Sequence, residues 1–205
     1  MKVRTEARRE AIIEAAAHLF QEVGYERASM NELTRRLGGS KATLYGYFPS
    51  KEALFVEVVR SVATVHLSEA VGLLSAHGEE ELTFEQKLTC FGERMLFVLT
   101  NESSALAVYR MVMAEAGRSN IGMLFYEAGP SDCIEVLSTW MGEAMSRGEL
   151  GQAAPQVRAA QFLALLTAEV QVRLYQPASE PLEVEQIRAL VLRAVGMFMG
   201  GAASH

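Results

Sequence analysis

Residues 38–55 read GGSKATLYGYFPSKEALF, and this stretch decides how the N-terminal part of the chain folds. The opening pair of glycines ends the preceding helix, because glycine readily adopts the backbone angles that follow a helix C-terminus. Ser40 is then the expected N-cap of a helix over 41–47, and Ser50 is the expected cap of the next helix. A short helix directly after a tight glycine turn is typical of a helix-turn-helix.

The first helix of this motif begins at a capping box, Ser29-Met30-Asn31-Glu32. In such a box the serine hydroxyl accepts from the Glu32 amide, and the Glu32 carboxylate reaches back to the serine amide. Met30, Leu33 and Leu37 then face inward, and the predicted helix-turn-helix spans residues 29–48.

The second helix carries the side chains that suit DNA. Lys41 and Thr43 can reach phosphates and base edges, and the Ala42 methyl can contact a thymine methyl. Capped helix N-termini bind phosphate, and tyrosines and lysines donate to the DNA backbone. Leu44 and Phe48 are expected in the core, with Tyr45 half in it. The expected DNA-contacting residues are Ser29, Arg36, Ser40, Lys41, Ala42, Thr43, Tyr45, Tyr47 and Lys51.

Charge is distributed unevenly along the chain. The 205 residues contain 19 Lys and Arg and 25 Asp and Glu, a net charge of −6. Residues 1–51 hold nine basic and six acidic residues, a net +3, whereas residues 52–205 hold ten and nineteen, a net −9. A small basic segment on an acidic body favours contact with a polyanion at one end.

Several classes of protein are disfavoured by composition. The longest apolar run, residues 194–203, is shorter than the roughly 20 residues of a membrane span, and charged residues occupy the start of the chain, so we expect a cytoplasmic protein. Cys90 and Cys133 form no CxxC pair and are expected to be buried, unpaired hydrophobes. HExxH, GxSxG and Walker motifs are absent, so the sequence predicts no enzyme, metal or cofactor.

The remainder of the chain reads as helices, so the predicted fold class is all-α. Apolar residues at three- and four-residue steps predict the first helix over 5–23, and Gly24 ends it. Further helices are expected over 51–76, 83–100, 104–116, 119–128, 131–147, 155–176 and 183–200. No window alternates as a half-buried strand does, so no sheet is expected.

Residues 9–55 resemble the N-terminal domain of the TetR family of transcriptional regulators. The matching positions run from Arg9 through Leu19-Phe20 and Gly24-Tyr25 to the quoted stretch. Two positions depart from the family pattern: Gly39 stands where valine is usual, and Thr34 where alanine is usual. Gly39 leaves the turn with less apolar packing, so we expect looser positioning of the second helix.

The resemblance also implies how the rest of the chain is used. Residues 104–151 are similar to one common subgroup of TetR-like C-terminal domains. Such domains bind small molecules and dimerise through their last two helices. The implied domains are a DNA-binding domain over 1–50, a connecting helix over 51–76 and an effector and dimerisation domain over 77–205.

The residues themselves offer candidates for both implied sites. Aromatic and methionine faces are usually ordinary core, but they also suit an adaptable apolar cavity. The expected effector-pocket residues are Phe91, Met95, Tyr109, Arg110, Met113, Phe125 and Trp140. Wide apolar stripes on the last two helices suit a four-helix bundle formed by a homodimer. The expected dimer-interface residues are Ala160, Ala164, Thr167, Ile187, Val191 and Ala194.

The sequence therefore predicts a homodimeric regulator of the repressor type, with double-stranded operator DNA and a small hydrophobic effector as partners. One alternative is a small-molecule hydrolase or sensor that has lost DNA binding; Lys41, Tyr47 and Lys51 argue against it. Another alternative is an adaptor that acts through helix–helix contacts alone. Direct DNA binding distinguishes the prediction from both alternatives.

Overall fold

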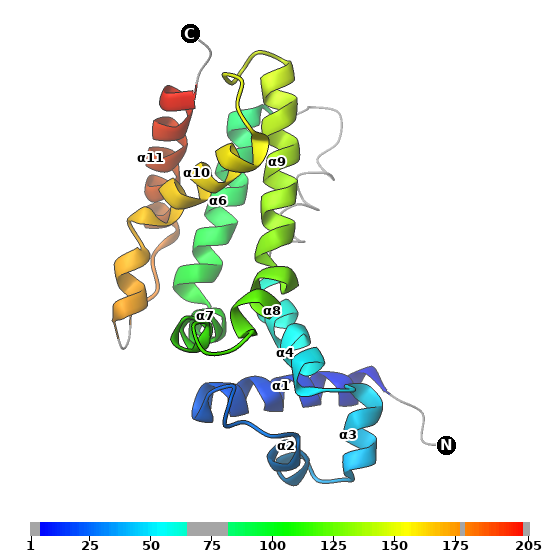
Figure 1. Cartoon of the computed structure of the whole chain (residues 1–205). Helices are drawn as coiled ribbons and strands as arrows, with labels where there is room; N and C mark the ends of the chain where they lie inside the picture. The colour runs from blue at the N-terminus through cyan, green and yellow to red at the C-terminus, as the bar shows by residue number, and fades with distance from the viewer. Residues whose placement is uncertain (1–4, 65–81, 177–178, 203–205) are drawn as a thin grey trace. The chain divides into compact units, whose positions relative to one another are not determined.

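A computed structural model describes residues 5–64, 82–176 and 179–202, and over these residues every regular element is helical (Figure 1). The predicted all-α fold is confirmed. None of the described helices is long and apolar enough to span a membrane. The elements are α1 (Glu6–Val23), α2 (Met30–Leu37), α3 (Lys41–Tyr47), α4 (Lys51–Val59), η1 (Arg60–Thr64), α6 (Phe84–Asn101), α7 (Ser103–Glu115), α8 (Ile121–Ala128), α9 (Pro130–Ser146), α10 (Pro155–Ala168), η2 (Gln171–Tyr175) and α11 (Val184–Ala202).

Packing divides the chain into two compact units. Unit 1 combines residues 1–64 with residues 104–129, and unit 2 combines residues 65–103 with residues 130–205. The expected domains over 1–50, 51–76 and 77–205 follow chain order, and their limits stay a prediction. In the packing, however, α7 and α8 belong with the N-terminal helices.

Four hydroxyl caps set the helix starts in unit 1. Thr5, Ser29, Ser40 and Ser50 each accept a hydrogen bond from the amide three residues further on. Each cap satisfies an amide that the helix itself leaves free. The predicted capping box at Ser29 forms only in half, because the Glu32 carboxylate binds arginines of its own helix instead.

The core of unit 1 is an aromatic cluster closed by aliphatic side chains. The ring centroids of Phe20 and Tyr25 lie 5.6 Å apart, and the Phe55 centroid lies 5.9 and 5.1 Å from them. From α7, Val108 and Val112 are fully buried in the same cluster. Helices α1, α4 and α7 are therefore held around one shared core.

Unit 2 packs α6 against α10 and α11, and α10 also packs against α9. Helices α6 and α11 lie side by side (Figure 1). Their approach is close at Gly92, where an added Cβ would lie 2.8 Å from Val191 Cγ1 and 3.0 Å from Leu166 Cδ1. The Asn101 side chain also exchanges two hydrogen bonds of 2.9 Å with the backbone of Leu182, which fixes the segment that leads into α11.

Two expected helices differ in length from the prediction. The helix expected over 51–76 is α-helical only to Val59 and continues as a π-helical turn over Arg60–Thr64; its expected remainder lies outside the described residues. The helix expected over 155–176 ends at Ala168, followed by the 3₁₀ turn η2. At this point Val170 is buried in the core of unit 2, and its amide bonds three residues back, to the Thr167 carbonyl at 3.1 Å.

Candidate nucleic-acid interface

The candidate recognition surface of unit 1 is the outer side of α3. Leu44 on the inner side and Phe48 just after the helix are each 3% exposed. They anchor the helix and leave the opposite side open. The open side presents Lys41, Ala42, Thr43 and Tyr45, all exposed. A basic, hydroxyl-bearing and methyl-bearing surface of this kind matches the donor, acceptor and methyl pattern of a DNA major groove.

The start of α3 is fixed by two hydroxyls. The Ser40 Oγ accepts from the Thr43 amide at 3.1 Å and shares a hydrogen bond with Thr43 Oγ1 at 2.9 Å. Both residues are exposed, so Thr43 is held in one orientation while its side chain stays accessible. This arrangement preorganises Thr43 for contact with a base edge or a phosphate.

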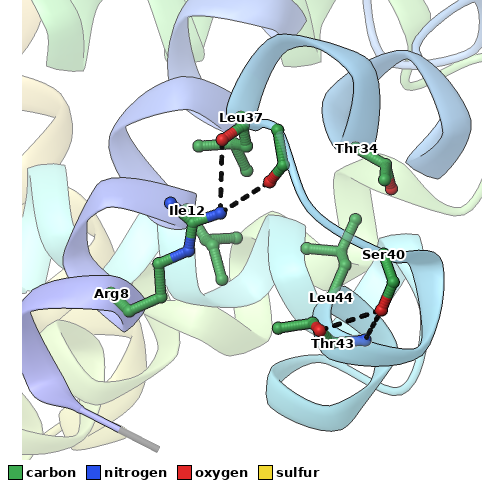
Figure 2. A pocket seen from close by; sticks show the side chains of 8 residues that line it. Arg8, Ile12, Thr34, Leu37, Ser40, Thr43 and Leu44 are labelled. Atoms are coloured by element: carbon green, nitrogen blue, oxygen red, sulfur yellow. Dashed lines mark hydrogen bonds between the residues drawn. The ribbon is translucent and has the colours of Figure 1, made fainter.

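The turn before α3 is held by an arginine that the sequence analysis did not single out. Arg8 Nη2 donates to the carbonyl oxygens of Leu37 at 3.3 Å and Gly38 at 2.8 Å (Figure 2). Gly38 has a φ of 64° and Gly39 a φ of 113°, angles that L side chains rarely adopt. The conformation of the turn thus favours glycine at both positions, and the two hydrogen bonds from Arg8 tie the start of the turn to α1.

A small hollow beside this turn includes the second departure from the family pattern. Thr34 lines it together with Arg8 and Ser40 (Figure 2). The Thr34 hydroxyl donates to the Met30 carbonyl at 2.7 Å, within its own helix. A threonine is thus accommodated in α2 with its hydroxyl satisfied.

Tyr47 has a structural role that the sequence analysis did not expect. Its side chain is half-buried against the core of unit 1, and its Oη accepts the Thr5 amide at 3.1 Å. The hydrogen bond ties the end of α3 to the start of α1. The phenolic hydrogen remains a donor that a phosphate could accept.

Lys51 points into the protein rather than toward the outer side of α3. Its Nζ donates to the carbonyl oxygens of Tyr25 at 2.9 Å, Ala28 at 3.3 Å and Glu26 at 3.4 Å. The same Nζ lies 4.2 Å from the centroid of the Tyr25 ring. An ammonium group has three donors, and in this structure all three are directed at the turn between α1 and α2. The expected Lys51–phosphate contact stays a prediction, and a phosphate would have to compete with these three carbonyl groups for the ammonium group.

The charge of Arg36 is also paired. Arg36 Nη1 lies 2.6 Å from Glu22 Oε2, and Arg36 Nε lies 2.9 Å from Glu32 Oε1. Arg35 binds the same Glu32 carboxylate at 2.7 Å, but its side chain is 77% exposed. Hydrogen bonds from Arg35 and Arg36 lower the pKa of Glu32 to about 2, so this carboxylate stays charged at neutral pH. Arg35, on the more open side of α2, is the better candidate for a DNA phosphate.

Two sequence comparisons agree with this geometry. Residues 12–58 match the family described as bacterial regulatory proteins of the tetR family, and residues 86–201 match the AefR-like transcriptional repressor C-terminal domain. The chain belongs to the TetR family. TetR-family proteins are transcriptional regulators, and the helix-turn-helix is their DNA-binding part.

Solved structures of TetR-family regulators have the same fold over nearly the whole chain. A TetR-family regulator from Mesorhizobium loti is 25% identical and superposes with a TM-score of 0.76, covering 99% of this chain and 100% of its own. The flavonoid-responsive regulator FrrA is 29% identical, with a TM-score of 0.74 and coverage of 98% and 100%.

Curated relatives match over shorter stretches. The A-factor receptor protein of Streptomyces griseus is 33% identical over 102 residues, which cover 49% of this chain and 33% of the receptor. The regulator RutR of Escherichia coli K12 is 36% identical over 62 residues, which cover 30% of this chain and 29% of RutR. The chain thus spans about a third of the length of these relatives.

The residues expected to line an effector pocket fall into both units of this TetR-family chain. In unit 1, the Tyr109 and Phe125 rings lie 5.9 Å apart. Met113 and Arg110 are on the same helix as Tyr109, and Met113 is 52% exposed. In unit 2, the Phe91 and Trp140 rings lie 6.1 Å apart, and Met95 packs against the same core. A single pocket lined by all these residues stays a prediction.

The expected dimer-interface residues divide by burial. Ile187, Val191 and Ala194 face the core of unit 2 itself, at 3%, 0% and 7% exposure, so they offer little surface to a second chain. Ala160 and Ala164 of α10 are exposed, and Thr167 is half-buried with its hydroxyl donating to the Leu163 carbonyl.

The open sides of these two helices carry apolar residues that the sequence analysis missed. Leu192 and Met197 of α11 are 52% and 68% exposed, and Val157 of α10 is 52% exposed. Glu169, whose partner the sequence left open, binds Arg193 of the same chain at 2.7 and 2.9 Å.

The cysteines differ from the expectation of burial. Cys90 is exposed and Cys133 is half-buried, and the two do not form a disulfide. Burial raises the pKa of the Cys133 thiol to about 12, which keeps this thiol protonated and unreactive at neutral pH.

Proposed function

We propose that this TetR-family regulator is a repressor that binds a palindromic operator as a homodimer. The observation that carries the proposal is the outer side of α3, where Lys41, Thr43 and Tyr45 are exposed on a helix anchored by Leu44. Two such helices related by a two-fold axis would enter successive major grooves, with half-sites about one helical turn apart or slightly more. The repressor role is supported by the description of the matching C-terminal family.

The dimer is proposed to form through α10 and α11. Contiguous apolar patches on a protein surface commonly mark an interface, and the exposed Val157 of α10 and Leu192 and Met197 of α11 are proposed to contribute to one. Ala160 and Ala164 add small, exposed positions at which a second chain could approach α10 closely. Two copies of this helix pair would make the four-helix bundle that TetR-family dimers use.

The effector is proposed to be a small, mainly hydrophobic compound that releases the DNA. Most candidate lining residues are apolar or aromatic, and Arg110 is the candidate to orient one polar group of the effector. A relative at 29% identity is named as flavonoid-responsive, which supports a planar aromatic ligand class. We also propose that the protein acts in the cytoplasm and performs no catalysis of its own.

A binding-site selection tests the DNA-binding part. Purified full-length protein is incubated with a library of random DNA duplexes, and the retained duplexes are sequenced. We expect a two-fold symmetric motif, and a Lys41→Ala, Thr43→Ala double variant should retain no motif. A motif without two-fold symmetry, or none with the unmodified protein, would contradict the proposal.

A fluorescence titration tests the effector part. Trp140 is the only tryptophan of the chain, so its emission reports on one location. A flavonoid such as naringenin is titrated into the complex with a selected duplex. We expect saturable quenching of Trp140 and DNA release over the same concentration range, because the two equilibria are linked. Release by phosphorylated metabolites alone would contradict a hydrophobic effector.

A further inference from the structure

The turn between α1 and α2 is held from two sides by charged side chains. Gly24 begins the turn with a φ of 79°, and the Ala28 amide closes it by donating to the Gly24 carbonyl at 3.2 Å. Lys51, at the start of α4, binds the carbonyl oxygens of the turn. Glu115, the last residue of α7, binds its amides. The cation and the anion thus bind opposite polar groups of one short segment.

The Glu115 contact is bidentate and joins distant parts of the sequence. Oε1 accepts from the Tyr25 amide at 3.0 Å, and Oε2 accepts from the Glu26 amide at 3.2 Å. Each carboxylate oxygen therefore takes one donor. The residues joined are 90 and 89 positions apart in the chain. Two hydrogen bonds from one carboxylate to adjacent amides thus tie the end of α7 to the turn.

The turn is shaped to admit the carboxylate. A Cβ added at Gly24 would lie 2.6 Å from Glu115 Oε1, closer than real Cβ contacts allow. A side chain at this position would therefore displace the carboxylate. The glycine at position 24 serves both the backbone angle of the turn and the approach of Glu115.

Lys51 and Glu115, the two residues that hold the turn, lie in different family matches. Lys51 lies within the DNA-binding match over 12–58, whereas Glu115 lies within the C-terminal match over 86–201. Lys51 therefore stabilises the turn from within the DNA-binding segment. Glu115 links the same turn to α7, a helix of the C-terminal segment that also buries Val108 and Val112 in the core of unit 1.

We propose that Glu115 is a positioning residue for DNA binding. By holding the amides of Tyr25 and Glu26, it sets the place of the turn and hence of α2 and α3, which follow the turn directly. A displacement of the end of α7 breaks this tie and lowers affinity for DNA. The inference rests on the proposed DNA-binding function and adds the contact through which the C-terminal segment controls it.

The test compares full-length Glu115→Ala and Glu115→Gln with the unmodified protein on a duplex obtained from the binding-site selection. The matched control is Glu127→Ala, which removes an exposed carboxylate from α8. We expect Glu115→Ala to lower affinity on the order of tenfold, within the range typical of coupled sites. Glu115→Gln keeps one acceptor oxygen, so its DNA affinity should lie between those of Glu115→Ala and the unmodified protein. Glu127→Ala should bind DNA as tightly as the unmodified protein.

Two further measurements show whether Glu115→Ala weakens DNA binding by moving the turn, by removing a contact with DNA or by unfolding the protein. The log–log dependence of affinity on salt should keep its slope in Glu115→Ala, because no phosphate contact is removed. Hydrogen exchange at the Tyr25 and Glu26 amides should accelerate in Glu115→Ala but not in Glu127→Ala. In the unmodified protein, bound DNA should slow exchange at the same two amides, since coupling is reciprocal.

The outcomes separate this inference from the function on which it rests. If the unmodified protein selects DNA but Glu115→Ala binds it equally well, the positioning role is overturned and the DNA-binding function stands. Unchanged exchange at both amides in Glu115→Ala would overturn the clamp itself. If the unmodified protein selects no DNA, the proposed function fails, and this inference fails with it.

Discussion

Arg8 Nη2 donates to the carbonyl oxygen of Gly38 at 2.8 Å, which ties the first turn of α1 to the turn of the helix-turn-helix. This bond lies where two consecutive glycines leave the backbone with the greatest freedom. Helix α3 is therefore positioned at its start by an arginine from α1 and at its end by the hydrogen bond between Thr5 and Tyr47.

Arg8→Ala should weaken DNA binding by freeing the turn. A hydrogen bond from a charged group is worth roughly 1.5–3 kcal/mol when buried; Arg8 is partly exposed, so we expect about 1 kcal/mol, or about a fivefold loss in affinity. Fluorescence anisotropy with a selected duplex measures this loss. Arg118→Ala removes one exposed positive charge elsewhere in unit 1 and should have a smaller effect. Equal losses in the two variants would indicate that Arg8 acts through net charge alone.

Lys51→Met should destabilise unit 1 and leave the salt dependence of DNA binding unchanged. The substitution keeps most of the aliphatic stem but removes the donors to three carbonyl groups and the cation above the Tyr25 ring. The expected loss is on the order of 1–3 kcal/mol in the free energy of unfolding, measured by urea denaturation. A flatter log–log salt slope together with unchanged stability would instead show that Lys51 contacts a phosphate.

Lys41→Ala and Thr43→Val should affect DNA binding in different ways. If Lys41 contacts one phosphate in each half-site, its loss removes two contacts per dimer and flattens the salt slope by about 1.8. Thr43→Val keeps the shape of the side chain but removes the hydroxyl, so it should change preference among operator variants at constant slope. Competition binding with single-base operator variants distinguishes these effects. A uniform loss for Thr43→Val would assign Thr43 to the backbone-contacting residues.

Leu192→Arg combined with Met197→Arg should yield monomers. Both side chains are more than half exposed, so arginine there leaves the core of unit 2 intact and adds charge to the surface of α11 that is proposed to pack against a second chain. Sedimentation at micromolar concentration should change from a dimer to a monomer, with DNA affinity falling to that of one half-site. Glu185→Arg, an exposed position at the start of α11, controls for added charge. An unmodified protein that sediments as a monomer would refute the interface.

Gly92→Ala should destabilise unit 2 although alanine is the better helix former. The added methyl would meet Val191 Cγ1 at 2.8 Å and Leu166 Cδ1 at 3.0 Å, and overpacking of this kind costs roughly 1–3 kcal/mol. Gly142→Ala is the matched control in α9, because its Cβ would meet only the Pro155 ring, at 3.9 Å. Thermal unfolding should show a lower Tm for the first variant and an equal or higher Tm for the second. The reverse order would mean that α6 shifts to accept the methyl.

Helix starts could be predicted from the sequence because their causes are local. Ser29, Ser40 and Ser50 bind amides only three residues away, so each cap can be read directly from the sequence. The end of α10 at Ala168 could not be predicted, since no glycine or proline occurs there. It depends on Val170 entering a core formed by other helices.

In the candidate site, too, features with local causes could be predicted from the sequence and features that depend on tertiary packing could not. The exposed side of α3 follows from its periodicity, which buries Leu44 and leaves Lys41 and Thr43 outside. The direction of Lys51 does not follow from periodicity, because it depends on carbonyl groups 23 to 26 positions earlier in the chain. The approach of Glu115 to the same turn depends on the packing of α7, which no local pattern encodes.

The composition of unit 1 bears on how hybrid regulators can be built from this chain. A chimera cut after residue 64 would lack α7 and α8, which contribute Val108, Val112 and Ile121 to the shared core. It would also leave the amides of Tyr25 and Glu26 without their carboxylate acceptor. The part of the chain that a hybrid must keep together is therefore discontinuous in sequence. A different effector-binding domain would have to retain residues 104–129 and could not simply be fused after the helix-turn-helix.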